Sequence, residues 1–392
     1  MAQLFLLRRA AQVLTLRGPV GVRRGAALND LGIITDGSVL IRDGKIISVG
    51  SARRIENLKE ARDAIEISAE GAIVMPGFVD PGLHLTLQYA NGGSGLPAKR
   101  RKMADFSDES LSLMRACLQH GTLNVQIKAC AGTGDLRSDF TVLRQLAVIG
   151  NNPVGMVRSW RVDRPHPEYK STADFQDVLG AVADRKLAQF FEVMPECGTS
   201  FSQQVWNAAA ERKMGVNLLW PGGSPALLEE LLRQANADAV WCPSNLSSEE
   251  CSVLSNSPAI AVFSPSGELL HESGGDAVRR VADSGAAIAL SSGYDANDTP
   301  SFNMQMVVAL AVLRLHLTIE QAITAATLNA AYAIRRGDVI GSIECGKRAD
   351  LVVLNIPDYR EIPRRFGINH VGLAMRDGNI VFNRIRSRAS AS

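Results

Sequence analysis

Six polar side chains lie at or just beyond the ends of short apolar runs in the middle of the chain. They are His84, Lys128, Arg158, Glu196, Cys242 and Asp295. Imidazole, thiolate and carboxylate groups are the usual protein ligands of zinc and iron, whereas lysine and arginine bind anionic or planar groups. Because the six residues are far apart in the sequence, they can act together only if the fold brings the ends of these runs to one place.

The sequence contains no complete residue set for another common chemistry. It lacks a GxSxG nucleophile motif, a GxxxxGK[ST] phosphate loop and a pair of histidines with helical spacing. Ser291 and Ser292 have only His84 as a conceivable base. Cys242 has no second cysteine nearby, and a buried inert thiol is the more frequent role of such a residue.

The apolar runs alternate with amphipathic stretches of helical period. Strand candidates fall at 73–78, 124–128, 155–158, 190–194, 216–220, 239–242, 259–263 and 286–291. Helical patterns such as 174–185 and 225–235 separate most of them and end at glycine or polar breaks. Eight such units favour a closed parallel (β/α)8 TIM-like barrel over an open doubly wound sheet, and barrels of this kind carry their chemistry on the loops after the strands.

Both ends of the chain have the pattern of short antiparallel strands instead. An Asp-Gly pair separates two alternating runs near residue 43 and again near residue 377. Such a pair tolerates the positive φ values of a tight hairpin turn. Each end alone has too few strands to cover its apolar face, so we predict one composite β-sandwich from residues 1–70 and 342–392 beside a barrel spanning 71–341, an α/β architecture.

Composition and charge exclude several classes of partner. Of the 392 residues, 46% are hydrophobic and 21% are charged, and the net charge is +2, so we expect no nucleic-acid partner. We find no apolar run long enough to cross a membrane and no signal-peptide pattern in the opening residues. The six cysteines include no CxxC pair, which predicts reduced thiols and a cytoplasmic protein.

Five segments resemble imidazolonepropionases of the amidohydrolase superfamily. They are LTLRGPVGVRRGAALNDLGIITDGSVLIRDGKI, GAIVMPGFVDP, HPEYK, TIEQAITAATLNAAYAI and IGSIECGKRADLVVLNIPDYREIPRRFGINHV. The resemblance implies a barrel with a β-sandwich, a homodimer, and hydrolysis of a C–N bond in an imidazolone ring. It also implies a metal held by two histidines after strand one, a histidine after strand five and an aspartate after strand eight, because a bound divalent ion supplies hydroxide near neutral pH.

Most of those metal ligands are replaced in this chain. Where the family has His-x-His, residues 82–84 read GLH, so only His84 remains. Residues 216–222 read VNLLWPG and offer no histidine after the fifth strand. The aspartate of strand eight aligns with Gly293, two residues before Asp295. Since a catalytic ion usually has three protein ligands, we expect no metal cofactor; zinc or iron would need a site rebuilt from His84, Cys242 and Asp295.

Four residues are predicted to bind a small-molecule ligand at the barrel mouth: Lys128, Arg158, Glu196 and Asp295. The resemblance matches Lys128 and Glu196 to a lysine and a glutamate of the family, although Lys128 is equally compatible with pairing to a carboxylate such as Glu192. Arg158, with Trp160, could bind an anionic or planar group or could pack structurally.

Three hypotheses follow from these replacements. The favoured one is a catalytically degenerate amidohydrolase homologue that keeps the fold and binds a small molecule. The second is an active C–N hydrolase with a rebuilt or metal-independent site. The third is a structural or regulatory subunit that pairs with an active relative. The glycine-rich segment after His84 lacks the arginine with which the family binds the substrate carboxylate, which leaves the imidazolone substrate unsupported.

Overall fold

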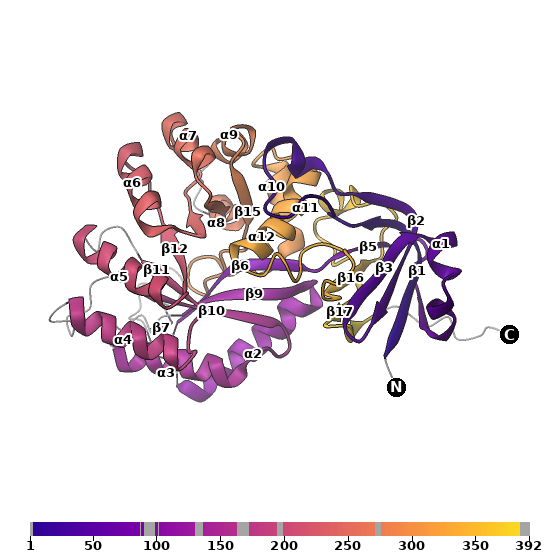
Figure 1. The fold of residues 1–392 in the computed structure, drawn as a ribbon, viewed down its shortest axis with the longest axis horizontal. Helices are drawn as coiled ribbons and strands as arrows, with labels where there is room; N and C mark the ends of the chain where they lie inside the picture. Colours follow the sequence, from indigo (N-terminus) through magenta and orange to yellow (C-terminus); the bar gives the residue numbers. More distant parts are fainter. Residues whose placement is uncertain are drawn as a thin grey trace.

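The computed structural model describes residues 3–86, 88–89, 99–100, 102–129, 136–162, 172–193, 199–270 and 276–384. Two large sheets lie next to each other along the long axis of the molecule (Figure 1). One is a parallel sheet flanked by helices, built from the middle of the chain. The other is a mixed sheet to which both ends of the chain contribute strands.

The parallel sheet has eight strands and is nearly closed into a barrel. Its order is β15-β14-β13-β12-β11-β10-β9-β6. The strands are β6 (Phe78–Leu85), β9 (Thr122–Ala129), β10 (Gly155–Val162), β11 (Phe190–Val193), β12 (Gly215–Leu219), β13 (Ala239–Trp241), β14 (Ile260–Phe263) and β15 (Ala287–Leu290). The predicted barrel is confirmed, and seven of the eight predicted strands coincide with its strands. The first prediction, 73–78, is wrong in its bounds, because residues 73–76 form β5 of the mixed sheet and the first barrel strand is β6.

The seam between the first and last strands is closed by individual contacts instead of a ladder. The backbone N–H of His84 donates to the carbonyl of Tyr294 at 2.7 Å, and His84 forms an isolated parallel bridge with Asp295. The Ser291 hydroxyl donates to the Asp80 carboxylate at 2.7 Å. Polar side chains therefore join β6 to the segment that follows β15.

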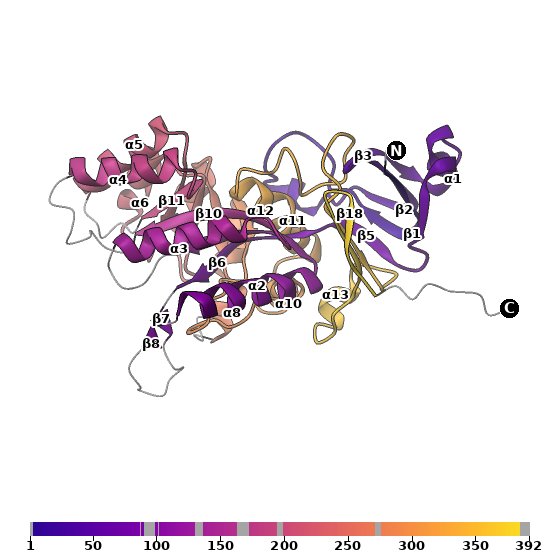
Figure 2. The ribbon, with the colours of Figure 1, turned by 90° about the horizontal axis from the view of Figure 1, so that it is seen from below.

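Helices cover the outside of the barrel (Figure 2). They are α2 (Met103–Gln119), α3 (Leu136–Ile149), α4 (Thr172–Asp184), α5 (Thr199–Glu211), α6 (Pro225–Ala235), α7 (Ser248–Asn256), α8 (Pro265–Leu270), α9 (Ala277–Asp283), α10 (Met304–Leu313), α11 (Ile319–Ala326) and α12 (Leu328–Ala333). The apolar stripe of α6, which includes Leu228 and Leu231, is buried, as amphipathic spacing predicts. Within the described residues no helix is both long and apolar enough to span a bilayer.

Strand alternation divides the barrel residues between two cores. Val79, Val157 and Phe190 face inward and pack with alanines of α12 at the amino-terminal end of the strands. Neighbouring positions such as Val125 and Phe191 face outward and join the large core beneath the helices. Nearer the carboxyl ends of the strands the inward positions are polar, and this region contains the candidate site.

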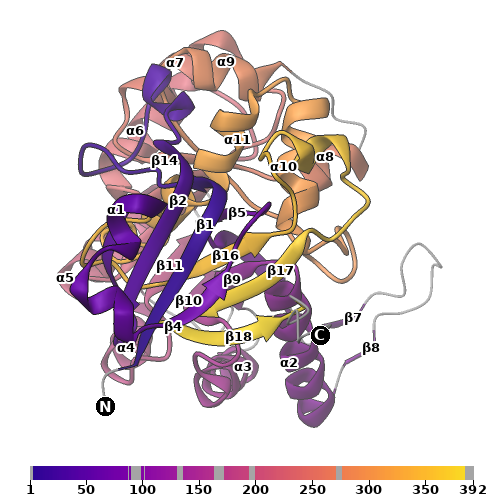
Figure 3. The same ribbon diagram turned by 90° about the vertical axis from the view of Figure 1, so that its right-hand side faces the viewer.

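The mixed sheet is composite, as predicted. Its path is β18-β17-β16-β5-β1-β2-β3, with β4 also paired to β1 (Figure 3). The strands are β1 (Leu4–Leu14), β2 (Ile33–Arg42), β3 (Lys45–Ser51), β4 (Ile65–Ser68), β5 (Ile73–Pro76), β16 (Leu351–Leu354), β17 (Val371–Arg376) and β18 (Asn379–Asn383). Shorter elements are η1 (Gly25–Asn29), α1 (Ala52–Glu56), η2 (Lys59–Asp63), β7 (Gln88–Tyr89), β8 (Lys99–Arg100) and α13 (Glu361–Arg364).

The two predicted Asp-Gly hairpins are both present, and their turns touch each other. Asp43 and Gly44 have φ values of 48° and 79°, and Asp377 and Gly378 have values of 51° and 71°. A Cβ on Gly378 would lie 2.5 Å from the Cα of Gly44, so this close approach needs glycine. The ends of the chain therefore meet at their turns as well as through the sheet.

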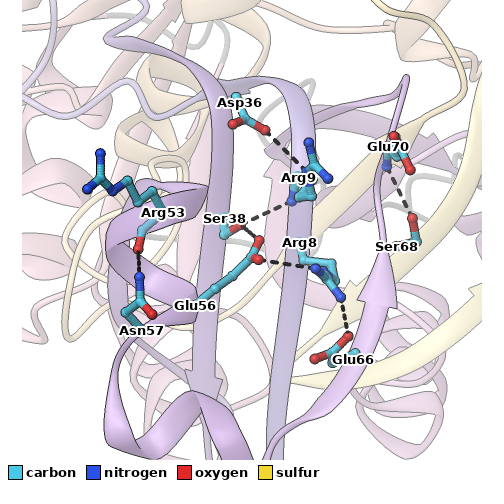
Figure 4. A network of polar contacts seen from close by, with 10 residues as sticks. All are labelled: Arg8, Arg9, Asp36, Ser38, Arg53, Glu56, Asn57, Glu66, Ser68 and Glu70. Carbon is cyan, nitrogen blue, oxygen red and sulfur yellow. Dashed lines mark hydrogen bonds and ion pairs between the residues drawn. The ribbon is translucent and has the colours of Figure 1, made fainter.

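The opening strand β1 (Leu4–Leu14) is irregular. A β-bulge, at which Arg9 has a φ of 55°, interrupts the apolar alternation of the opening segment. Next to the bulge the Arg8 guanidinium donates to Glu56 and Glu66, and the Ser38 hydroxyl donates to Glu56 (Figure 4). This network ties β1 to β2, β4 and α1, which is a structural role.

Candidate ligand site at the barrel mouth

Five side chains of the strand ends gather inside the carboxyl end of the barrel. They are His84 on β6, Lys128 on β9, Arg161 on β10, Glu192 on β11 and Trp241 on β13. Each belongs to the inward-facing set of its strand. The carboxyl ends of the strands are where barrels of this type bind their ligands.

Lys128 and Glu192 form a buried ion pair. The Lys128 Nζ lies 2.6 Å from Glu192 Oε2, and both side chains are 0% exposed. The same Nζ lies 3.3 Å from the centroid of the Trp241 ring, which adds a cation–π contact. Burial lowers the pKa of Lys128 to about 7, although the Glu192 carboxylate opposes this shift. The pairing of Lys128 with Glu192, which the sequence also allowed, is therefore present.

Arg161 contacts both His84 and the ion pair. Its Nη1 lies 2.9 Å from Nδ1 of His84, and its Nε lies 3.9 Å from Glu192 Oε1. Arginine can only donate, so Nδ1 of His84 accepts and its proton sits on Nε2. Burial, followed by the positive charges of Arg161 and Lys128, holds the pKa of His84 well below its usual range. His84 is thus a neutral imidazole.

The Trp241 ring fills the space beside Gly82, the position that the resemblance matches to the first metal ligand of the family. A Cβ on Gly82 would lie 2.1 Å from Cη2 and 2.5 Å from Cζ2 of Trp241. Real Cβ atoms do not come this close to aromatic carbons. A histidine at position 82 therefore does not fit while the Trp241 ring keeps this position.

Space is also limited at Gly293, which the resemblance matches to the aspartate ligand after strand eight. Gly293 has a φ of 61°, and a Cβ there would lie 2.2 Å from Oγ and 2.8 Å from Cβ of Ser264. The Ser264 hydroxyl donates to the carbonyl of Ser292 at 3.0 Å, which fixes its place. On β12, alternation turns Leu219 to the inward face that Asn217 occupies, so an alkyl side chain points inward there.

The other predicted metal remnants point in different directions. The Cys242 thiol is buried among the helix-facing residues, 3.6 Å from the carbonyl of Val240, and burial raises its pKa well above the usual range. Asp295 accepts a hydrogen bond from the backbone of Asn297 at 2.8 Å and so caps its own turn. In the part of the chain that the structure describes, no three His, Cys, Asp or Glu side chains group closely enough to hold a metal ion.

Arg158 lies on the outer side of the barrel, which corrects the prediction that it lines the mouth. Its guanidinium donates to the carbonyls of Leu187 at 2.7 Å and Lys186 at 2.8 Å. Trp160 shares this outer face and donates from its indole to Asp139. The predicted strand ended at residue 158, whereas β10 continues to Val162. The inward arginine at the true strand end is Arg161, which the sequence analysis missed.

Two further predictions concern Glu196 and the serine pair Ser291 and Ser292. Glu196 lies outside the described residues. Ser291 and Ser292 donate to the Asp80 carboxylate, together with the backbone N–H groups of Ser292 and Gly82 at 3.1 Å each. Burial nevertheless raises the pKa of Asp80. The serines are thus hydrogen-bonded to Asp80, not to His84, and they close the barrel seam.

A parallel eight-stranded barrel with a composite terminal sheet and a polar mouth defines the architecture of the chain. A model of the Amidohydrolase family matches residues 225–381. Imidazolonepropionase from Alkaliphilus metalliredigens is 29% identical over 419 residues, covering 97% of this chain and 98% of that protein. The Bacillus cytotoxicus imidazolonepropionase is 29% identical over 421 residues, covering 97% of each chain.

A solved structure gives the same fold at lower identity. A triazine hydrolase variant superposes with a TM-score of 0.76 at 13% sequence identity, covering 99% of this chain and 96% of that one. The sequence matches support an imidazolonepropionase-like chain of the amidohydrolase superfamily, and the solved structure shows the shared fold.

Proposed function

We propose that this protein is an imidazolonepropionase-like amidohydrolase homologue that binds a small molecule at the barrel mouth without a catalytic metal. The observation that carries the proposal is the Trp241 ring, which fills the space above Gly82 where the family places a metal-binding histidine. An ion there would need three or more convergent donors, and this position contributes none.

The charges at the mouth support the same proposal. The positive groups beside Glu192 are the Lys128 ammonium and the Arg161 guanidinium, both provided by the chain itself. His84, the one matching family histidine, has its Nδ1 engaged by Arg161. The chain itself therefore supplies the positive charge that balances the Glu192 carboxylate, and no divalent ion is required for this.

A working hydrolase rebuilt from His84, Cys242 and Asp295 is the weaker alternative. The Cys242 thiol belongs to the helix-facing core, and Asp295 is engaged in its own turn. Assembling these three donors around one ion would require several side chains and backbone segments to move together.

Turnover of imidazolonepropionate tests the proposed function. The purified protein is assayed alone and with added zinc, iron or manganese, beside the Alkaliphilus metalliredigens imidazolonepropionase under the same conditions. We expect no hydrolysis above the uncatalysed background with any metal. Metal-dependent turnover that approaches that of the relative would overturn the proposal.

A further inference from the structure

Several buried polar atoms around Lys128 have no hydrogen-bond partner. Among the described residues, Gln126 Nε2, Ser159 Oγ, Asn217 Oδ1 and Trp241 Nε1 are buried without a hydrogen-bond partner. Gln126 lies two positions before Lys128 on the same face of β9, and Ser159 is the direct Cα partner of Lys128 on β10. Buried polar groups normally have partners, so these atoms are available to hydrogen-bond water or a small polar ligand inside the barrel.

Lys128 has the environment of a nucleophilic amine. Its side chain is 0% exposed, with the Glu192 carboxylate 2.6 Å away. Arg161 adds a second positive charge on the other oxygen of Glu192, at 3.9 Å. Enzymes activate lysine by desolvation and by a neighbouring cation, and a carboxylate in contact can carry the proton. The lowering of the pKa of Lys128 to about 7 agrees with this arrangement.

We propose that Lys128 is a carbonyl-reactive lysine, which condenses with a small aldehyde that enters from the carboxyl end of the barrel. The entry side is occupied by Arg161, whose side chain is 20% exposed and has to turn aside. The inference rests on the proposed function in one respect, namely that no metal ion occupies the mouth beside the amine.

The condensation balances without any further reagent. The nitrogen lone pair of Lys128 forms a bond to the carbonyl carbon, and the π electrons of the carbonyl group move to its oxygen. Glu192 accepts a proton from the nitrogen and delivers it to the oxygen, which gives a neutral carbinolamine. Glu192 then transfers the second N–H proton to the hydroxyl group, which leaves as water while the C=N bond of the imine forms. The donors that we assign to the carbonyl oxygen are the unpartnered Ser159 hydroxyl, on the residue directly across from Lys128, and the unpartnered Gln126 amide.

The test is reductive trapping with acetaldehyde. The full-length protein is incubated at pH 7 with acetaldehyde and cyanoborohydride, and peptide mass mapping gives the rate at which each lysine gains an ethyl group. Lys347 is the matched internal control, because burial also lowers its pKa and a carboxylate, Glu344, lies 3.7 Å away. We expect Lys128 to react at least about tenfold faster than Lys347.

Two variants distinguish an activated lysine from one that is merely accessible to acetaldehyde. Lys347→Gln should leave labelling of Lys128 unchanged, and Glu192→Gln should slow it by at least about tenfold, because the amide cannot carry the proton. Labelling of Lys128 no faster than that of Lys347 in the unaltered protein would overturn the inference, and this readout requires no variant to fold. Metal analysis of the same preparation reports separately on the proposed function.

Discussion

The Trp241 indole lies directly over the backbone of Gly82, with Cη2 2.1 Å from the place where a Cβ on that glycine would stand. Residue 82 is the position that the sequence resemblance matches to a metal-binding histidine of the family, and the glycine and the ring depend on each other. Glycine leaves room for the ring, and the ring then contacts the Lys128 ammonium. A single aromatic side chain thus contacts both the backbone at Gly82 and the buried ion pair.

Gly82→Ala is predicted to destabilise the protein by about 1–3 kcal/mol, because the added methyl group overpacks against the ring. Urea denaturation measures the free energy of unfolding. Gly367→Ala is the control, since a Cβ there meets no heavy atom within 4 Å. Equal, small effects of the two substitutions would show that Trp241 does not hold the position described.

The Lys128 and Glu192 pair is predicted to behave as a coupled unit. Removing one partner, by Lys128→Met or Glu192→Gln, should cost about 3–5 kcal/mol, because an uncompensated group is left in a buried position. The double variant Lys128→Met/Glu192→Gln should recover much of that loss. A double-mutant cycle in urea gives the coupling energy, and strictly additive effects would contradict a direct pair.

Stability is predicted to rise with pH above neutrality. Folding lowers the pKa of Lys128 from 10.5 to about 7, so the folded state binds fewer protons than the unfolded state between these values. The free energy of unfolding should therefore increase as the pH rises through this window. Denaturation curves at several pH values compare the unaltered protein with Lys128→Met/Glu192→Gln, and an identical pH slope in both would exclude Lys128 as the source.

The two arginines of β10, Arg158 and Arg161, should differ in their effect on the pKa of His84. Arg161→Gln removes a positive charge 2.9 Å from Nδ1, so the pKa of His84 should rise toward its ordinary value. Arg158→Gln is the matched control, because that guanidinium binds carbonyls on the outer side. It should reduce stability and leave the pKa of His84 unchanged. NMR titration of His84 measures its pKa in each variant. Equal changes in that pKa would mean that Arg158 and Arg161 do not lie on opposite faces of β10.

Much of the architecture could be predicted from the sequence, because periodic patterns report local structure. Seven of the eight apolar runs coincide with barrel strands, and both Asp-Gly pairs form hairpin turns with positive φ. The first run belongs mainly to β5 of the mixed sheet, and the barrel begins with the β6 strand that follows it. The possible partnership of Lys128 with Glu192 was also visible, since both lie near strand ends.

The site was harder to predict, because it depends on exact strand ends and on distant contacts. A third strand that ended at residue 158 would place Arg158 at the mouth, whereas β10 continues to Val162 and its inward alternation reaches Arg161. The contact between Ser291 and Asp80 joins residues 211 positions apart, and no local pattern signals it. The same holds for Trp241 above Gly82, which only the closed barrel brings together.

The most direct test of the account is the metal content of the purified protein after incubation with excess zinc and iron and removal of unbound ions. Inductively coupled plasma mass spectrometry should find well below one ion per chain, and a strong chelator should leave the melting temperature unchanged. One tightly bound ion per chain, together with a melting temperature that falls by many degrees on chelation, would contradict the account.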